Sequence, residues 1–216
     1  MNILNQYKKI KKNIEDYSFN CPINLIVVTK ERSLADIQKI INVGHIHFGE
    51  NRVQESVNKW KDILKLNSNI KLHFIGKLQT NKVADVISNF SFIHSLDNDK
   101  LALKISLEEK KLKKTLSYFI QVNLGEENQK SGILKKDLPR FVNFCKNDLK
   151  LNIIGLMCLP PINGDTDKYF KELRQLAINN NLKELSMGMS NDYILAIKNG
   201  STFIRIGSAI FEEKFN

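Results

Sequence analysis

The chain has 216 residues, of which 42% are apolar, and its 33 basic and 23 acidic side chains give a formal net charge of +10. Glycine and proline are not enriched, at 10 and 4 residues, which excludes collagen and a disordered chain. The apolar runs are far shorter than the roughly 18 residues of a membrane span, and no segment resembles a signal peptide. We therefore expect a single globular domain over residues 1–216, located in the cytoplasm, with no membrane partner.

The positive charge raises the question of nucleic-acid binding, because clustered basic side chains neutralise phosphates. Of the basic residues, 28 are Lys and only 5 are Arg, and the lysines are spread over expected helix faces. Base recognition relies on bidentate arginine, and single-strand binding relies on aromatic residues among basic ones. Neither pattern occurs, so we expect no specific nucleic-acid partner. Weak, non-specific binding of polyanions stays an alternative.

Taken in chain order, the first predicted element is a helix, because Ile3, Leu4, Tyr7, Ile10 and Ile14 form an apolar stripe at helical spacing. A unit then repeats in which a short apolar run, a loop and an amphipathic stretch follow one another. The apolar runs predict eight strands, at residues 24–28, 46–49, 71–75, 91–94, 117–123, 152–158, 184–187 and 202–206.

Two of the helices between these strands have clear ends. Ser33 is expected to cap a helix that Gly44 terminates, and Ser190 is expected to cap another that Gly200 terminates. Strands that alternate with helices predict an α/β fold with a parallel sheet. We favour a (β/α)8 TIM barrel. The alternative, an open doubly wound sheet, predicts a glycine-rich loop after the first strand, but residues 29–33 contain no glycine.

The chemistry of a TIM barrel lies at the C-terminal ends of its strands. The first predicted strand is almost wholly apolar and is followed by Thr29 and Lys30. A lysine at the mouth of an apolar barrel is expected to be partly desolvated, which lowers its pKa and favours Schiff-base chemistry. The opposing interpretation is that Lys30 extends into solvent.

A second feature follows the last two strands. Gly188 and Ser190 follow the seventh, and Gly207 and Ser208 follow the eighth, where barrels commonly bind phosphate. An amine together with a phosphate cradle suggests pyridoxal phosphate or a phosphosugar bound by a Schiff-base aldolase. An aldolase needs a residue for proton transfer, and the mouth offers few candidates beyond Glu50 and Asp192.

No metal site is expected. His45 and His47 begin the second strand and should lie at the bottom of the barrel, where no further ligands complete a metal shell. Cys21, Cys145 and Cys158 are scattered and predict neither disulfides nor a metal knuckle.

The segment 72–82, LHFIGKLQTNK, resembles the HFIGxLQxNK signature of the pyridoxal phosphate homeostasis proteins, the YggS/PROSC family. Shorter matching motifs stand in the family's order over nearly the whole chain, at residues 28–30, 49–55, 130–132, 155–157, 187–190 and 205–208. The resemblance implies a barrel of the alanine-racemase N-terminal type (fold type III) that holds pyridoxal 5'-phosphate on Lys30 as an internal aldimine.

The same resemblance implies the other cofactor-binding residues. Ser190, Gly207 and Ser208 look like the phosphate cradle, and Asn51 and His73 look like neighbours of the cofactor ring. Arg205 resembles the arginine that faces the pyridine nitrogen. The implied partners are the cofactor and pyridoxal-phosphate-dependent apo-enzymes, and the implied state is a monomer or weak dimer.

Four residues depart from the family pattern: Thr29, Glu31, Arg52 and Leu72. Thr29 keeps a hydroxyl, whereas Arg52 and Leu72 are expected to alter the surroundings of the ring. Racemases and decarboxylases of this fold carry a further β-domain and a second acid or base, and the residues after the last predicted strand leave no room for that domain. We therefore expect a cofactor carrier with no catalytic residues. The alternative is an enzyme of the racemase or decarboxylase kind.

Overall fold

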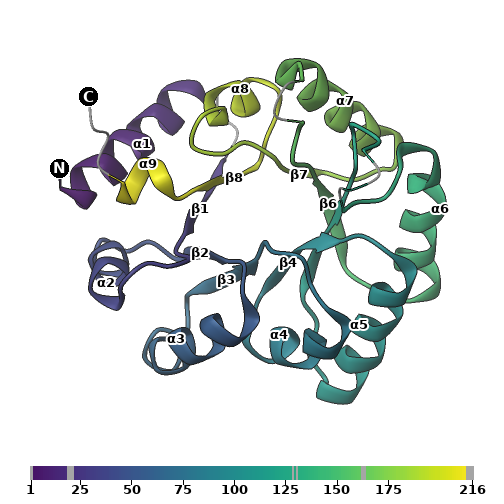
Figure 1. Ribbon diagram of the computed structural model, residues 1–216, viewed down its shortest axis with the longest axis horizontal. Helices are drawn as coiled ribbons and strands as arrows, with labels where there is room; N and C mark the ends of the chain where they lie inside the picture. The colour runs from purple at the N-terminus through teal and green to yellow at the C-terminus, as the bar shows by residue number, and fades with distance from the viewer. Residues whose placement is uncertain (1, 19–21, 128, 130, 162–163, 213–216) are drawn as a thin grey trace.

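The computed structural model describes residues 2–18, 22–127, 129, 131–161 and 164–212. In this part of the chain, eight strands pair in parallel, in chain order, and close into a barrel because β1 pairs with both β2 and β8 (Figure 1). This confirms the predicted barrel and excludes the open sheet. The strands are β1 (Asn24–Val28), β2 (His47–Glu50), β3 (Lys71–Phe74), β4 (Phe92–Leu96), β5 (Ser117–Gln121), β6 (Ile153–Met157), β7 (Glu184–Ser186) and β8 (Phe203–Ile206).

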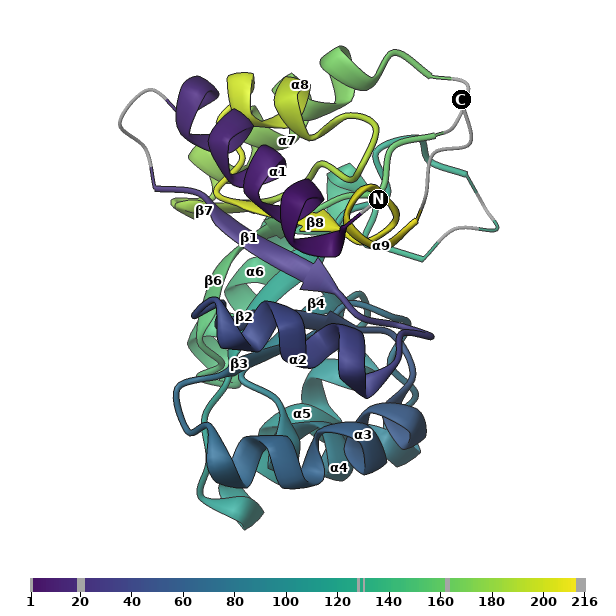
Figure 2. The same cartoon turned by 90° about the vertical axis from the view of Figure 1, so that its left-hand side faces the viewer.

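Helices surround the barrel on its outside (Figures 1 and 2). They are α1 (Ile3–Tyr17), α2 (Leu34–Asn42), α3 (Val53–Leu66), α4 (Val83–Asn89), α5 (Asp99–Leu112), α6 (Leu138–Asn143), α7 (Thr166–Asn179), α8 (Tyr193–Lys198) and α9 (Ser208–Phe211). The predicted N-terminal helix is confirmed as α1, which packs against α2, α8 and α9. The predicted cap of α2 is also confirmed, because the Ser33 hydroxyl accepts a hydrogen bond from the Asp36 amide at 3.1 Å.

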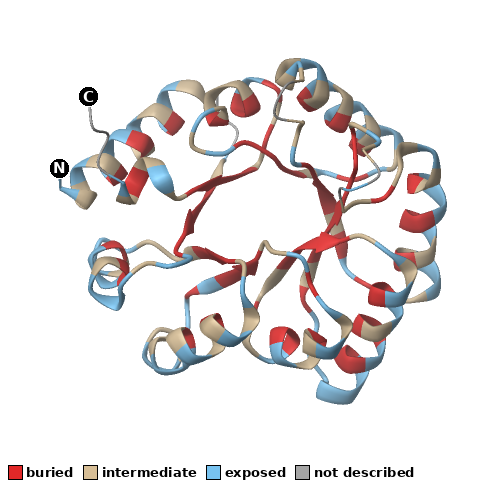
Figure 3. Cartoon of the chain, in the orientation of Figure 1, coloured by how far each residue is buried: buried red, intermediate tan, exposed pale blue. Residues whose placement is uncertain are grey.

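Buried residues lie along the strands and on the surrounding helices (Figure 3). The apolar ones form two separate layers, one inside the barrel and one between the strands and the helices. The inner layer is built from Ile26, Phe119, Met157 and Phe203. Because side chains alternate along a strand, these four residues define which positions face inward. On β8, the alternation that points Phe203 inward also points Arg205 inward, and two residues further it reaches Gly207, just beyond the strand. The register therefore aligns residues of the predicted site along the inside of one strand.

Within the described ranges, no helix combines the length and the apolar character that crossing a bilayer requires. The cytoplasmic location stays a prediction.

Candidate functional site

Lys30 lies at the mouth of the barrel, two residues beyond the end of β1 at Val28. The chain turns here, since the Arg32 amide donates to the Thr29 carbonyl at 3.2 Å and Glu31 has a left-handed φ of 58°. Lys30 is exposed. This position corresponds to the interpretation in which Lys30 extends into solvent, because the turn carries the residue beyond the strands.

Asn51 follows β2 at the same mouth. Its Oδ1 atom is buried and has no hydrogen-bond partner among the described residues. Gly76, which follows β3, packs against the Asn51 backbone so closely that a Cβ atom at position 76 would lie 2.8 Å from the Asn51 Cα. Buried polar atoms in proteins are nearly always hydrogen bonded. An unpartnered amide oxygen at a barrel mouth therefore marks a place for a donor group of a ligand.

The two loops after β7 and β8 meet at their serines. Ser208 Oγ lies 3.0 Å from Ser190 Oγ, which also accepts a hydrogen bond from the Ala209 amide at 3.3 Å. Gly207 lies beside β1, because a Cβ atom there would be 3.2 Å from the Val28 Cβ. Ser190, Gly207 and Ser208 are thus brought together, next to the strand that leads to Lys30.

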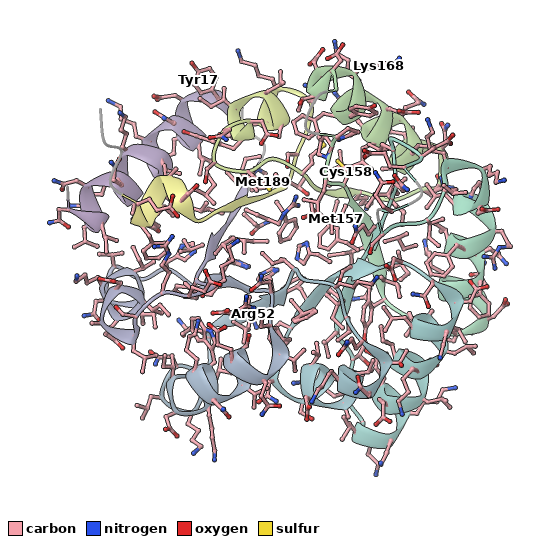
Figure 4. All side chains as sticks on the ribbon, in the orientation of Figure 1. Tyr17, Arg52, Met157, Cys158, Lys168 and Met189 are labelled. Carbon is pink, nitrogen blue, oxygen red and sulfur yellow. The ribbon has the colours of Figure 1, made fainter. Side chains whose placement is uncertain are left out.

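The predicted capping role of Ser190 is wrong. Helix α8 begins at Tyr193, and its N-cap residue is Asp192. The Asp192 side chain accepts a hydrogen bond from the Met189 amide and closes the turn before the helix. Ser190 lies in this turn, and its hydroxyl is directed to α9 and Ser208 instead. Figure 4 shows Met189 in this loop.

Arg205 is the deepest charged residue of the predicted set, with 4% of its surface exposed. Its Nη1 donates to Ser186 Oγ at 2.7 Å and its Nη2 donates to the Cys158 carbonyl at 3.0 Å. Within the described part of the chain, no carboxylate forms an ion pair with it. Burial lowers its pKa. A buried charge without a counter-ion is costly, so such a residue is a candidate for function.

His73 lies inside the barrel with both ring nitrogens occupied by other histidines. Its Nε2 atom is 2.9 Å from His47 Nδ1, and its Nδ1 atom is 2.9 Å from His94 Nε2. The ring of Phe92 stacks on it at a centroid distance of 4.2 Å. His73 is connected to Arg205 through His94 and Ser186. Neither His94 nor Ser186 was predicted as a site residue. Their signal in the sequence is a histidine or serine at an inward-facing position of an otherwise apolar strand.

Both carboxylates considered for an aldolase are engaged in the fold. Glu50 is fully buried, and one of its oxygens accepts hydrogen bonds from Thr29, Lys59 and Trp60. Asp192 holds the turn before α8. Glu50 therefore has a structural role through one oxygen, while its Oε2 atom is buried without a hydrogen-bond partner among the described residues, and Asp192 has a structural role in the turn.

The departures from the family pattern lie in three different places. Glu31 and Arg52 form an exposed ion pair of 3.3 Å at the mouth, so these two departures contact each other. Thr29 is buried and donates to Glu50. Leu72 belongs to the outer apolar layer. The expectation that Leu72 alters the surroundings of the ring is therefore wrong, because its side chain and that of His73 face opposite sides of β3.

The described residues contain no group of three or more His, Cys, Asp or Glu side chains placed to hold a metal ion. Cys145 and Cys158 are free and buried, and burial raises the pKa of each thiol to about 12. Cys21 lies outside the described residues. Cys158 follows Met157 at the end of β6 (Figure 4).

Comparison with known proteins finds a family that matches nearly the whole chain and a relative that is similar over most of its length. The family of the alanine racemase N-terminal domain matches residues 6–214. A pyridoxal phosphate homeostasis protein from Synechocystis sp. is 38% identical over 205 residues, which cover 89% of this chain and 92% of the relative.

Two solved structures have the same fold. PipY from Synechococcus elongatus with PLP bound matches with a TM-score of 0.86 and 30% identity, over 97% of this chain and all (100%) of that chain. Alanine racemase from Corynebacterium glutamicum matches with a TM-score of 0.72 and 14% identity, over 98% of this chain and 63% of that chain. The second likeness shows a shared fold only.

Proposed function

Because the chain belongs to the family of pyridoxal phosphate homeostasis proteins, we propose that it binds pyridoxal 5'-phosphate at the barrel mouth and supplies it within the cell, without robust turnover of amino acids. The cofactor, when bound, brings an aldehyde that condenses with a lysine amine and releases one water. Lys30 is the amine that we assign to this bond. Its exposure supports access from solvent, both for loading and for transfer to apo-enzymes.

The observation that carries the proposal is the buried Arg205, which lies inside the barrel below Gly207 with only neutral partners. A guanidinium is a permanent donor, so it fits an uncharged acceptor such as a pyridine nitrogen and disfavours protonation of that nitrogen. An unprotonated ring is a poor electron sink, which reduces carbanion chemistry on amino acids. Arg205 therefore supports both binding of the cofactor and the lack of turnover.

Two further features fit the same ligand. The hydroxyls of Ser190 and Ser208, with the backbone at Gly207, offer donors to a phosphate, beside the strand that ends before Lys30. The unpartnered Asn51 Oδ1 offers an acceptor to a ring hydroxyl at the same mouth. Hydrogen bonds to one oxygen of Glu50 and to Asp192 give both carboxylates a structural role in the fold.

The test is to titrate the purified protein with pyridoxal phosphate and record its absorbance spectrum. We expect a band from the lysine adduct in the wild type and none in Lys30→Ala. Lys77→Ala is the matched control, because Lys77 is an exposed lysine in the loop after β3 and should keep the band. Borohydride reduction followed by peptide mass mapping should place the added mass on Lys30.

Three results would contradict parts of the proposal. A protein that takes up no cofactor overturns the binding function, and a band that survives in Lys30→Ala overturns the assignment of the lysine. Rapid racemisation or decarboxylation of an amino acid by the loaded protein favours the enzymatic alternative. Cleavage or formation of a phosphosugar that requires Lys30 favours the aldolase.

A further inference from the structure

A continuous chain of polar side chains crosses the apolar interior of the barrel. It runs from His47 to His73 over 2.9 Å, from His73 to His94 over 2.9 Å and from His94 Nδ1 to Ser186 Oγ over 2.8 Å. The last link is the hydrogen bond of 2.7 Å from Arg205 Nη1 to Ser186 Oγ. The chain therefore connects the start of β2, at the bottom of the barrel, with the guanidinium assigned to the cofactor.

The middle of this chain is dry and uncharged. His73, His94 and Ser186 have no exposed surface. Phe119 stacks on His94 at a centroid distance of 4.3 Å, as Phe92 does on His73. Burial lowers the pKa of both buried histidines well below the usual value, so both rings are neutral at neutral pH. Each neutral imidazole then has one N–H donor and one bare nitrogen acceptor.

Arg205 favours one direction of the hydrogen bonds, because a guanidinium only donates and the reverse direction would make Ser186 Oγ accept from both Arg205 and His94, leaving the Ser186 hydrogen without an acceptor among the described residues. Ser186 accepts from Arg205 and uses its own hydrogen to donate to His94 Nδ1. His94 then carries its proton on Nε2 and donates to His73 Nδ1. By the same step, His73 donates from Nε2 to His47 Nδ1. This direction pairs one donor with one acceptor at every link.

We propose that His47, His73, His94 and Ser186 are positioning residues that hold Arg205 through this one-directional chain, and that His47 fixes the proton positions of the buried rings from the far end of the barrel. His47 is half-buried, so it is the link nearest to solvent. Without its acceptor nitrogen, the Nε2–H of His73 has no partner. The donor-to-acceptor direction of the hydrogen bonds is then set only from the Arg205 end of the chain.

The direct test uses the ligand-free protein and nitrogen NMR of the histidine side chains at neutral pH. In the wild type, we expect His73 and His94 to be protonated at Nε2 only. In His47→Phe, we expect a population of His94 that is protonated at Nδ1. His45→Phe is the matched control, because His45 lies at the same end of the barrel but bonds Tyr7 and the His47 carbonyl, outside the chain. It should leave His94 unchanged.

Ser186 provides a second test at the other end of the chain, for the case that His47→Phe does not fold. Ser186→Ala removes the link between His94 and Arg205 and should also populate the Nδ1–H form of His94, whereas Ser186→Thr keeps the hydroxyl and should restore the wild-type spectrum. A wild-type His94 protonated at Nδ1, or an unchanged His94 in both His47→Phe and Ser186→Ala, would overturn the proposal.

The affinity for pyridoxal phosphate gives a second test of the positioning role, and this test rests on the proposed function. We expect His47→Phe and Ser186→Ala to raise the Kd for pyridoxal phosphate by about tenfold, because each weakens a hydrogen bond to a buried charge. His45→Phe and Ser186→Thr should stay within about twofold of the wild type by the same reasoning. Unchanged affinity in the first two variants contradicts positioning of Arg205. A wild type that binds no cofactor contradicts the proposed function, while the NMR result still tests the direction of the hydrogen-bond chain.

Discussion

Three donors converge on one carboxylate oxygen of Glu50 behind the barrel mouth. The Thr29 hydroxyl lies 2.7 Å away, the Trp60 indole nitrogen 3.0 Å and the Lys59 ammonium 3.0 Å. These residues belong to the end of β1, the end of β2 and α3. The contact therefore connects the two loops that carry Lys30 and Asn51 to the same helix, and it stabilises the mouth.

This arrangement predicts the effect of changing Thr29. In Thr29→Val, the shape is kept but a hydrogen bond to a buried carboxylate is lost, so we expect the free energy of unfolding to fall by about 1.5–3 kcal/mol. Thr29→Ser keeps the hydroxyl and should lose less than half of that amount. Urea unfolding of the three proteins measures the difference. Equal stability of the Val and Ser variants would contradict the role of the hydroxyl.

At the scale of residues, Arg205 was predicted through the family resemblance, and the strand register agrees with that role. Alternation from Phe203 places Arg205 on the inward side of β8, and Gly207 follows the strand. The sequence left the exposure of Lys30 open between two interpretations, because it depends on a turn in which a non-glycine residue, Glu31, takes a left-handed conformation. The partners of His73 were not predictable either, since they come from strands far apart in the chain.

At the scale of elements, all eight strands were predicted, and their ends differ from the prediction by at most two residues. Apolar runs identify the strands because a parallel barrel buries both faces of each strand. The end of β5 shows why the boundaries shift. The prediction extends it to residue 123, but after Gln121 the chain only forms a bridge from Val122 to Ile133. The wider π-helical turn after α6, Phe144–Asp148, has no signal in the sequence pattern.

The two serines expected to cap helices should now behave differently. Ser33→Ala removes a helix cap and should lower the free energy of unfolding by about 1 kcal/mol. Ser190→Ala removes no cap of α8, so its stability should stay within about 0.5 kcal/mol of the wild type, while its affinity for pyridoxal phosphate should fall. Chemical unfolding and cofactor titration of both variants measure the two effects. Loss of stability in Ser190→Ala with unchanged cofactor affinity would contradict this assignment.

At the scale of the whole molecule, the net charge of +10 is separate from the site chemistry. Only one of the arginines, Arg205, is among the buried polar residues of the described chain. The molecule does, however, bury His73 and His94 completely and half-bury His45 and His47. Burial lowers the pKa of His45 to about 4, lowers that of His47, and lowers those of His73 and His94 well below the usual value. All four histidines of the chain are therefore easier to protonate after unfolding.

This difference predicts that the protein loses stability in mild acid. Above about pH 6.5, the histidines are neutral in both states and stability does not depend on them. Below that pH, the unfolded chain binds protons that the folded chain does not, so each histidine lowers the free energy of unfolding by up to about 1.4 kcal/mol per pH unit until its folded pKa is reached. For His45, this window ends at about pH 4.

Urea unfolding between pH 8 and pH 5 measures the loss, in a range that lies above the titration of most carboxylates. We expect a plateau down to about pH 7 and a steep fall below it. His45→Gln should show a shallower fall, because it removes one titrating ring and leaves the buried chain of histidines in place. A free energy of unfolding that stays constant from pH 7 to pH 5 would show that the rings take up protons in the folded barrel at the same pH as in the unfolded chain, which the one-directional chain to Arg205 does not allow.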